Sequence, residues 1–380
     1  MSNQQRVIVG VVILAVALWG AGALWGRDET PPPSPAPVPT TASSGNASPA
    51  SSPAAEVTTV AENLSIPWEI VFLPDGAMLV TERSGTVKRV NPDGKALAVA
   101  GVAHVGEGGL LGMALHPDFS DNRYLYLYLT TRDGGGLTNR VERYRFEDDV
   151  LSDRKVIIER IPGSNNHDGG RIAFGPDGKL YVATGDAERT ANAQDRNSLA
   201  GKILRLNDDG SIPSDNPFGN ATYSYGHRNV QGLAWDGQGR LWATEHGRSI
   251  PVSGYDELNL IEKGANYGWP TIQGDGIQAG MRGSAAHSGA KDTWAPAGLA
   301  FVGDKAYFAG LRGEALYEAT IGSDGKAKVR ELFTQRWGRL RAVTVGPDGA
   351  LYLSTSNTDG RGKKKAGDDR IIRVPITALW

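Results

Sequence analysis

A short phrase that recurs six times between residues 72 and 353 constrains the fold more than any other feature of the sequence. Each copy has an apolar residue, a Pro-Asp-Gly-like turn and then a run of strand-forming residues. Proline presets φ, aspartate bonds back to the backbone and glycine accepts a positive φ, so each copy predicts a tight turn leading into a β-strand. The copies are 72–80 (FLPDGAMLV), 115–127 (LHPDFSDNRYLYL), 174–182 (FGPDGKLYV), 235–242 (WDGQGRLW), 301–308 (FVGDKAYF) and 345–353 (VGPDGALYL).

The spacing of the copies predicts a six-bladed β-propeller. Their turn aspartates follow one another at intervals of 43, 59, 59, 68 and 44 residues. Such intervals suit four-stranded blades with some long loops. No run of a dozen residues has a convincing helical stripe, so we expect an all-β class. A β-sandwich would have fewer strands, and a solenoid would have a shorter and stricter repeat.

The first 55 residues are expected to lie outside this fold. Arg6 and Arg27 bracket 20 uncharged residues, and a helix of that length spans about 30 Å, the hydrocarbon thickness of a bilayer. We expect residues 1–27 to be an N-terminal hydrophobic helix, either a signal anchor or a cleaved signal peptide, which places the rest of the chain outside the cytoplasm. Residues 28–55, rich in Pro, Ser and Ala, are expected to be a disordered linker. This leaves 56–380 as the propeller domain.

Composition excludes several kinds of chemistry. The chain has no cysteine, so disulfides, thiolate metal sites, iron–sulfur clusters and a cysteine nucleophile are excluded. The net charge of −2 gives no long-range attraction to nucleic acid. In a propeller, functional residues come from loops of several blades at the mouth of the central channel. They should therefore lie between the turn phrases, scattered along the sequence.

Two of these loops offer a base and hydrogen-bond donors. In NNHDGGR (165–171), His167 can accept a proton near neutral pH, and the two glycines allow a close approach. In YGHRNVQG (225–232), Arg228 can fork onto a carboxylate or quinone oxygen, and Asn229 can donate a second bond. On spacing alone, each segment could equally be a plain turn or a bridge between blades.

Three further arginines precede strands in other repeats. Arg339 and Arg341 in GRLR lie on one face at strand spacing, and two adjacent like charges are unfavourable unless an anion lies between them. Arg312 in LRG precedes another strand. Together with Arg228 and His167, these cations predict a polyanionic ligand; the alternative is simple solvation.

The stretch 244–270 combines carboxylates with glycine-rich backbone, which can supply the oxygen ligands of Ca²⁺. It lacks a D-x-D-x-D-G loop, so an ordinary hydrogen-bonded loop explains the pattern equally well.

Seven phrases, in order from about residue 66 to residue 350, carry a resemblance to a known family. They are IPWEIVFLPDGAMLVTERSG, GEGGLLGMALHPDF, NNHDGGRIAFGPDG, GKILRLNDDGSIPSDNPF, YGHRNVQGLAW, DELNLIEKGANYGWP and GRLRAVTVGPDG. This ordered set resembles the PQQ-dependent aldose dehydrogenases, that is, the soluble glucose dehydrogenase and sorbosone dehydrogenase family.

The resemblance implies a propeller that binds PQQ, a planar ortho-quinone with three carboxylates, through Ca²⁺. His167 matches the family's general base, which takes the proton of the sugar's C1 hydroxyl while the C1 hydride passes to the quinone. Arg228 and Asn229 match the pair that contacts the quinone oxygens, and Arg228 would stabilise the charge that grows there.

Other contacts are implied by position alone. Arg339 and Arg341 match the pair that binds the PQQ carboxylates, and Arg312 matches a further PQQ contact that is usually Lys in the family. The carbonyls of Gly247 and Arg248 match the ligands of the cofactor's Ca²⁺. Glu257 and the Tyr267 carbonyl match a second, structural Ca²⁺ site.

Three positions depart from the family pattern. Glu107 stands where the best-known members have Gln, and a carboxylate near three others is repulsive unless it is protonated or bound to Ca²⁺. This puts its expected role in cofactor binding in question. Arg248 stands where the best-known members have Pro, and His246 replaces another residue beside the metal.

The implied function is oxidation of the C1 hydroxyl of aldose sugars to aldonolactones. The expected partners are the sugar, an extracytoplasmic electron acceptor and, through an uncleaved N-terminal segment, the membrane; no nucleic acid is expected. Two alternatives stay open. A Ca²⁺-dependent lactonase or esterase propeller would need carboxylate and Asn side chains converging on one metal. A non-catalytic binding propeller at the cell surface would not need His167.

Overall fold

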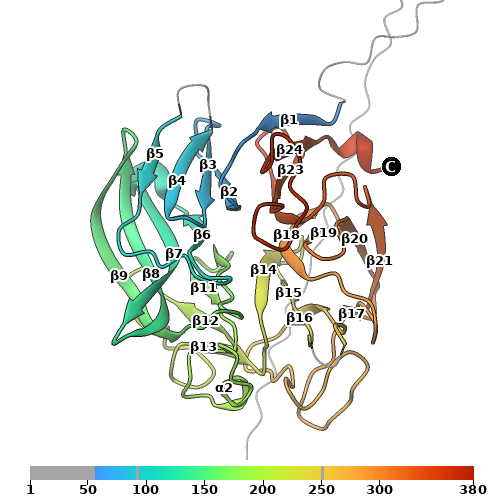
Figure 1. Cartoon of the computed structure of the whole chain (residues 1–380). Coiled ribbons are helices and arrows are strands. Elements are labelled where there is room, and N and C mark those ends of the chain that lie inside the picture. The colour runs from blue at the N-terminus through green and yellow to red at the C-terminus, as the bar shows by residue number, and fades with distance from the viewer. Residues whose placement is uncertain (1–55, 91–93, 250–251) are drawn as a thin grey trace, which may run out of the picture. The chain divides into compact units, whose positions relative to one another are not determined.

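Six four-stranded antiparallel sheets make up the described part of the chain, residues 56–90, 94–249 and 252–380, in this computed structural model (Figure 1). The innermost strands β2, β6, β10, β14, β18 and β22 contact one another in ring order, and the last contacts the first. The sheets are therefore the blades of a closed six-bladed β-propeller, as the repeated phrases predict.

The first three blades follow the chain from the inner strand to the outer strand. They are β2 (Pro67–Phe72), β3 (Met78–Glu82), β4 (Thr86–Val90) and β5 (Ala96–Ala98); β6 (Leu110–Leu115), β7 (Tyr124–Asp133), β8 (Gly136–Glu147) and β9 (Val150–Pro162); and β10 (Ile172–Phe174), β11 (Leu180–Ala183), β12 (Lys202–Leu206) and β13 (Thr222–Tyr225).

The fourth and fifth blades follow the chain in the same way, and the sixth ends with a strand from the N-terminal side of the domain. They are β14 (Val230–Trp235), β15 (Leu241–Glu245), β16 (Glu257–Ile261) and β17 (Ala286–His287); β18 (Pro296–Val302), β19 (Lys305–Gly310), β20 (Leu316–Ile321) and β21 (Ala327–Leu332); and β22 (Leu340–Val345), β23 (Leu351–Thr355), β24 (Ile371–Val374) and β1 (Thr58–Ala61). Helix is confined, in the described ranges, to the short segments α1 (Phe119–Asn122), α2 (Ala191–Gln194) and a 3₁₀ turn (Ile376–Leu379).

Each recurrent phrase forms the hairpin between the first and second strands of one blade. In the third blade, Asp177 accepts the backbone N–H of Lys179 at 3.1 Å, and Gly178 has a φ of 69°. In a tight turn, Asp is expected to accept a backbone N–H and Gly to adopt a positive φ, as both do here. The turn holds Phe174 opposite Leu180, so both strands enter the blade in a fixed register.

The ring is closed by pairing the two ends of the domain. β1 lies antiparallel to β24, with Thr58 opposite Arg373 and Thr59 opposite Ile372 (Figure 1). The sixth blade thus takes three strands from the C-terminal part and its outermost strand from the N-terminal part. The repeated phrases do not predict this pairing, because β1 precedes the first of them.

The expected N-terminal hydrophobic helix and the linker lie outside the described residues, and so does the proposed boundary at residue 55. No helix within the described ranges is long and apolar enough to cross a membrane.

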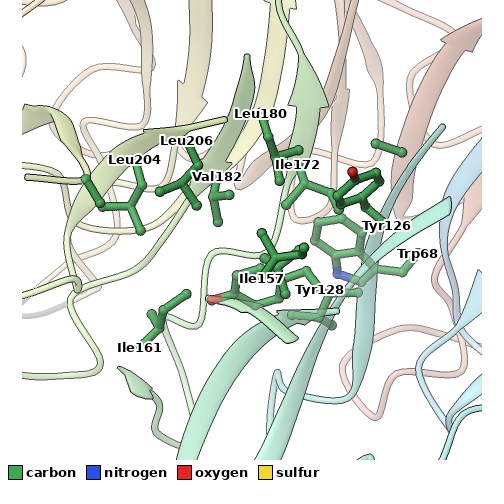
Figure 2. Packing of buried hydrophobic residues seen from close by; sticks show 14 residues of the cluster. Trp68, Tyr126, Tyr128, Ile157, Ile161, Ile172, Leu180, Val182, Leu204 and Leu206 are labelled. Atoms are coloured by element: carbon green, nitrogen blue, oxygen red, sulfur yellow. The ribbon is translucent and has the colours of Figure 1, made fainter. Parts of the chain in front are cut away.

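Apolar side chains on both faces of the sheets hold neighbouring blades together. One cluster of 14 buried residues, drawn in Figure 2, joins Tyr126 and Tyr128 of the second blade with Leu180 and Val182 of the third. Tyr128 also donates its hydroxyl to the Asp168 carbonyl at 2.7 Å. The packing between blades is thereby tied to the loop that contains His167.

Replacing Leu180 by Ala should lower the free energy of unfolding by about 2–5 kcal/mol, because a fully buried side chain leaves a cavity between two blades. Denaturant titration would measure the loss. Val150→Ala is the control, since Val150 is 49% exposed and its truncation should change stability by less than about 0.5 kcal/mol. Equal effects of the two substitutions would contradict this account of the core.

Candidate active site

A cavity of about 610 Å³ collects most of the site residues predicted from the sequence. It is lined by loops of several blades, so side chains far apart in the chain meet there. Eight of the eleven predicted residues line it: Glu107, His167, Arg228, Gly247, Arg248, Arg312, Arg339 and Arg341. The other three, Asn229, Glu257 and Tyr267, lie outside the lining.

The imidazole of His167 is oriented by a buried carboxylate. Its Nδ1 lies 2.7 Å from Asp186 Oδ1. Asp186 also accepts the indole N–H of Trp269 at 2.8 Å and the backbone N–H of Glu188 at 2.9 Å. An ionised carboxylate offers only acceptors, so Nδ1 carries the proton and donates it to Asp186. In the neutral imidazole, Nε2 is then the ring nitrogen without a proton, which can act as a base.

The backbone of His167 lies so close to residue 185 that only glycine fits there. His167 has a φ of 63°, and a β-carbon on Gly185 would lie 1.8 Å from its carbonyl oxygen. The same carbonyl accepts the N–H of Ala187 at 3.2 Å. Glycine at 185 therefore lets the two loops approach closely enough to place Asp186 beside the imidazole.

Arg228 is presented to the cavity from a buried position. Its backbone N–H donates to Glu245 at 2.5 Å, and its carbonyl accepts the N–H of Asp186 at 2.7 Å, which ties it to the partner of His167. Its Nη2 donates to Ser249 Oγ at 3.1 Å, while its Nε has no hydrogen-bond partner among the described residues. Burial lowers the pKa of this guanidinium, so an anion in the cavity would stabilise its charged form.

Two arginines at another wall of the cavity share one carboxylate, and the charge of a third, Arg83, acts on one of them. Asp359 accepts from Arg339 Nε at 3.1 Å and Nη2 at 2.8 Å, and Arg341 Nη2 lies 4.0 Å from it. Burial, together with the nearby charge of Arg83, lowers the pKa of Arg341 to about 9. One carboxylate does not balance three cations, so this wall favours an anionic ligand.

The other two predicted arginines flank the loop that follows β15. Arg312 Nη1 donates to Ser253 Oγ at 2.5 Å. Arg248 Nε donates to the Val252 carbonyl and its Nη2 to the Ala290 carbonyl, both at 3.1 Å. No carboxylate in the described part of the chain forms an ion pair with either guanidinium. Both therefore add positive charge to the cavity wall.

Glu107 is paired rather than isolated. Its Oε2 accepts the backbone N–H of His167 at 3.1 Å, and its Oε1 accepts from Arg361 Nη1 at 2.5 Å. Burial opposes ionisation, but the ion pair with Arg361 and the N–H of His167 outweigh it and lower the pKa of Glu107. Repulsion is thus relieved by an arginine that the sequence patterns did not single out.

The segment Gly247–Arg248 is shaped by a second buried carboxylate, Asp256. Asp256 Oδ1 accepts the N–H of Gly247 at 2.7 Å, and its Oδ2 accepts the N–H groups of Trp294 at 2.7 Å and Ala295 at 2.8 Å. A β-carbon on Gly247 would lie 2.2 Å from the Gly254 carbonyl. The N–H of Gly247 therefore points to Asp256, and the same carboxylate ties this loop to the segment of Trp294 and Ala295.

Glu257 lies in a separate oxygen-rich position on β16. Its Oε1 accepts the N–H of Gly274 at 2.8 Å and its Oε2 accepts from Asn259 Nδ2 at 3.2 Å. Burial and the neighbouring Glu245 raise its pKa to about 8. The side-chain oxygens of Asn259 and Gln273 are buried without a partner among the described residues. Carboxylate and amide oxygens are the ligand types that a hard cation prefers.

Asn229 and Tyr267 are both buried. Asn229 Oδ1 accepts the N–H of Gly169 at 3.0 Å, so it braces the loop of His167. Tyr267 stacks on His227 with ring centroids 4.7 Å apart and donates its hydroxyl to Leu260 at 2.5 Å.

Sequence reasoning missed the residues that hold the predicted ones in place. They are Asp186, Asp256, Trp269, Asp359 and Arg361. Four of them come from a loop other than that of the residue they support, so no local spacing links those partners; Asp256 lies in the same loop as Gly247, between β15 and β16. The one available signal was an acidic residue just after a strand, as in Asp186 after β11.

The fold and this site together define a propeller whose cavity combines a histidine base with a wall of arginines. Residues 64–372 match the family described as Glucose / Sorbosone dehydrogenase. The chain belongs to this family.

Individual relatives cover most of the chain. The aldose sugar dehydrogenase YliI of Escherichia coli is 33% identical over 95% of this chain and 98% of its own length. Quinoprotein glucose dehydrogenase B of Acinetobacter calcoaceticus is 36% identical over 57% of this chain and 52% of its own length. The solved structure of the PQQ-bound aldose sugar dehydrogenase of Streptomyces coelicolor is 41% identical, covers 84% of this chain and 98% of that chain, and has a TM-score of 0.77.

Gly185→Ala should destabilise the protein by about 1–3 kcal/mol, because the new β-carbon would overlap the His167 carbonyl and the backbone must shift. Denaturant titration measures this effect. Gly237→Ala is the matched control, because open space surrounds that position and no positive φ is required there. A Gly185→Ala variant as stable as the control would show that the two loops are not closely packed.

Proposed function

We propose that this protein is a PQQ-dependent aldose sugar dehydrogenase that oxidises the C1 hydroxyl of its substrate. The observation that carries the proposal is the meeting of His167, bonded through Nδ1 to Asp186, with six arginines in one cavity. A Ca²⁺-dependent lactonase would need carboxylate and asparagine side chains converging on one metal, and a purely binding propeller would not need an oriented base.

The residues of the cavity fit PQQ by charge and by donor type. Arg339, Arg341 and Arg312 line the cavity; we infer that the first two would hold its carboxylates and that Arg312 would add a further cation. Arg228 offers a buried guanidinium whose Nε has no partner in the described part of the chain. We further propose that Ca²⁺ binds the carbonyls of Gly247 and Arg248, and that a second Ca²⁺ binds at Glu257 with the Tyr267 carbonyl.

The chain's own residues account for the acid–base part of the reaction. When bound, PQQ supplies the two-electron acceptor for the hydrogen that leaves C1 of the sugar. His167 Nε2 accepts the proton of the C1 hydroxyl, and Asp186 stabilises the imidazolium that forms. The C1–O bond becomes a carbonyl, which in a cyclic aldose is a lactone. Arg228, with its positive charge held in a buried position, favours negative charge in the cavity.

We also propose that the protein acts outside the cytoplasm and passes electrons to an acceptor there. Support comes from the uncharged run between Arg6 and Arg27, which is long enough to act as an export signal or anchor.

The proposal predicts that the purified protein, given PQQ and Ca²⁺, shows the absorption of bound PQQ and that an aldose changes it to that of the reduced cofactor. An artificial dye should then be reduced in repeated turnovers. Absence of any aldose-dependent change, with PQQ bound, would overturn the assigned reaction.

Asp186→Asn should lower kcat by about 10²–10⁴-fold while PQQ still binds, because the amide no longer fixes the tautomer that leaves His167 Nε2 free. His167→Ala should lose at least as much. Stopped-flow reduction of bound PQQ by sugar measures both. Asp177→Asn, in an exposed hairpin turn, is the control. Full activity in His167→Ala would show that another group is the base.

Glu257→Gln should reduce the thermal stabilisation that Ca²⁺ gives to the protein, since it removes one ligand charge from the proposed structural site. Differential scanning fluorimetry with added Ca²⁺ and with a chelator measures the shift. Glu262→Gln, an exposed carboxylate paired with Arg282, serves as the control. The same Ca²⁺-dependent shift in wild type and Glu257→Gln would place the cation elsewhere.

A further inference from the structure

The loop between β23 and β24 brings Arg361 to the cavity beside His167. Arg361 lines the cavity, its Nη1 donates to Glu107 Oε1 at 2.5 Å, and its Nη2 donates to Asn166 Oδ1 at 2.8 Å. One guanidinium therefore joins three loops, two of which lie at the start of neighbouring blades.

The position of Arg361 is set by buried carboxylates. Asp359 accepts the backbone N–H of Arg361 at 2.9 Å through Oδ1, while its Oδ2 holds Arg339. Asp369, fully buried, accepts the N–H of Asn357 at 2.6 Å and the hydroxyl of Thr358 at 2.5 Å. The loop is thus built on internal hydrogen bonds, and the carboxylate that orients Arg339 also orients Arg361.

Both oxygens of Glu107 are already engaged as acceptors. One takes the N–H of His167 and the other takes Arg361 Nη1. The backbone N–H of Glu107 donates in turn to the Asn165 carbonyl at 2.8 Å. An ionised carboxylate has no proton to donate, so Glu107 cannot hydrogen-bond to the oxygens of an anionic cofactor.

The pair has the charge and donors of a neutral amide. A glutamine, which the best-known members of the family have here, is neutral and offers both an acceptor and a donor. In this chain Glu107 provides the acceptor, and Arg361 provides the donor while cancelling its charge. A guanidinium has five N–H donors, and the two bonds described leave three for a ligand.

We propose that Arg361 is a further cofactor-binding residue that donates to a carboxylate or quinone oxygen of PQQ, and that Glu107 is a positioning residue that holds Arg361 and the main chain of His167. The proposal rests on the proposed function. It assigns no direct cofactor contact to Glu107.

The binding test compares Arg361→Met, Glu107→Gln and the double variant by titrating PQQ into the apoprotein in the presence of Ca²⁺, with tryptophan fluorescence as the signal. Arg361→Met should raise the Kd by about 10–100-fold, because it removes a donor and leaves an unpaired carboxylate beside the anion. Glu107→Gln should change the Kd by less than about threefold. The double variant should bind better than Arg361→Met alone, since the amide removes the unpaired charge.

Arg282→Met is the matched control. Arg282 is exposed to a similar degree, forms a 2.5 Å ion pair with Glu262 and lies outside the cavity lining. It should bind PQQ as the wild type does. A wild-type Kd in Arg361→Met, a larger loss in Glu107→Gln than in Arg361→Met, or simple addition of the two effects would each overturn the proposal.

The positioning role of Glu107 is tested at saturating PQQ. Glu107→Ala removes the acceptor of the His167 N–H and should lower kcat by about tenfold or more with little change in the KM for sugar. Glu107→Gln keeps an acceptor and should retain most of kcat. Equal kcat in Glu107→Ala and wild type would overturn this part. Failure of the wild type to bind PQQ would refute the proposed function itself, and this inference with it.

Discussion

The balance of charge around the cavity is the constraint on which the rest of the site depends. Six arginines line one cavity, and two of them, Arg339 just before β22 and Arg341 on β22, share the carboxylate of Asp359. Repulsion within such a cluster lowers the stability of the protein when no anion is bound, so the packing of the blades must offset it. An anion with several carboxylates relieves this repulsion, and the relief contributes to its binding free energy. Stability and affinity are therefore opposed in this protein, as they commonly are at functional sites.

Buried carboxylates organise the site more than the cations do. Asp186, Asp256 and Asp359 each accept two or more N–H groups, and each fixes a different functional element: the imidazole of His167, the segment at Gly247, and the arginine wall. The propeller makes this arrangement possible because every blade directs a loop toward the same axis. A carboxylate from one blade can then hold a side chain from the next without any contact along the chain.

The repeated hairpins of this molecule can be predicted from the sequence, but the contacts between segments that are distant in the sequence cannot. Turns such as Asp177–Gly178 are determined by local chemistry, so six phrases were sufficient to predict six blades. Eight of the predicted site residues line one cavity, largely because their phrases resemble those of a known family. The closing pair β1 and β24, the Asp186 partner of His167 and the Glu107–Arg361 pair could not be predicted in this way. The first and third of these depend on closure of the whole ring, and the second depends on the pairing of β10 with β11.

The pairing of β1 with β24 makes the propeller domain nearly circular. Its first and last strands lie in one blade, so the position of a blade in the ring does not depend on where the domain starts along the chain. A permuted gene that joined these ends through a short peptide and began at a different hairpin would encode the same neighbours around the axis. The cavity is formed by the whole ring and does not depend on where the domain starts. Additional segments could therefore be inserted at turns on the outer rim without changing it.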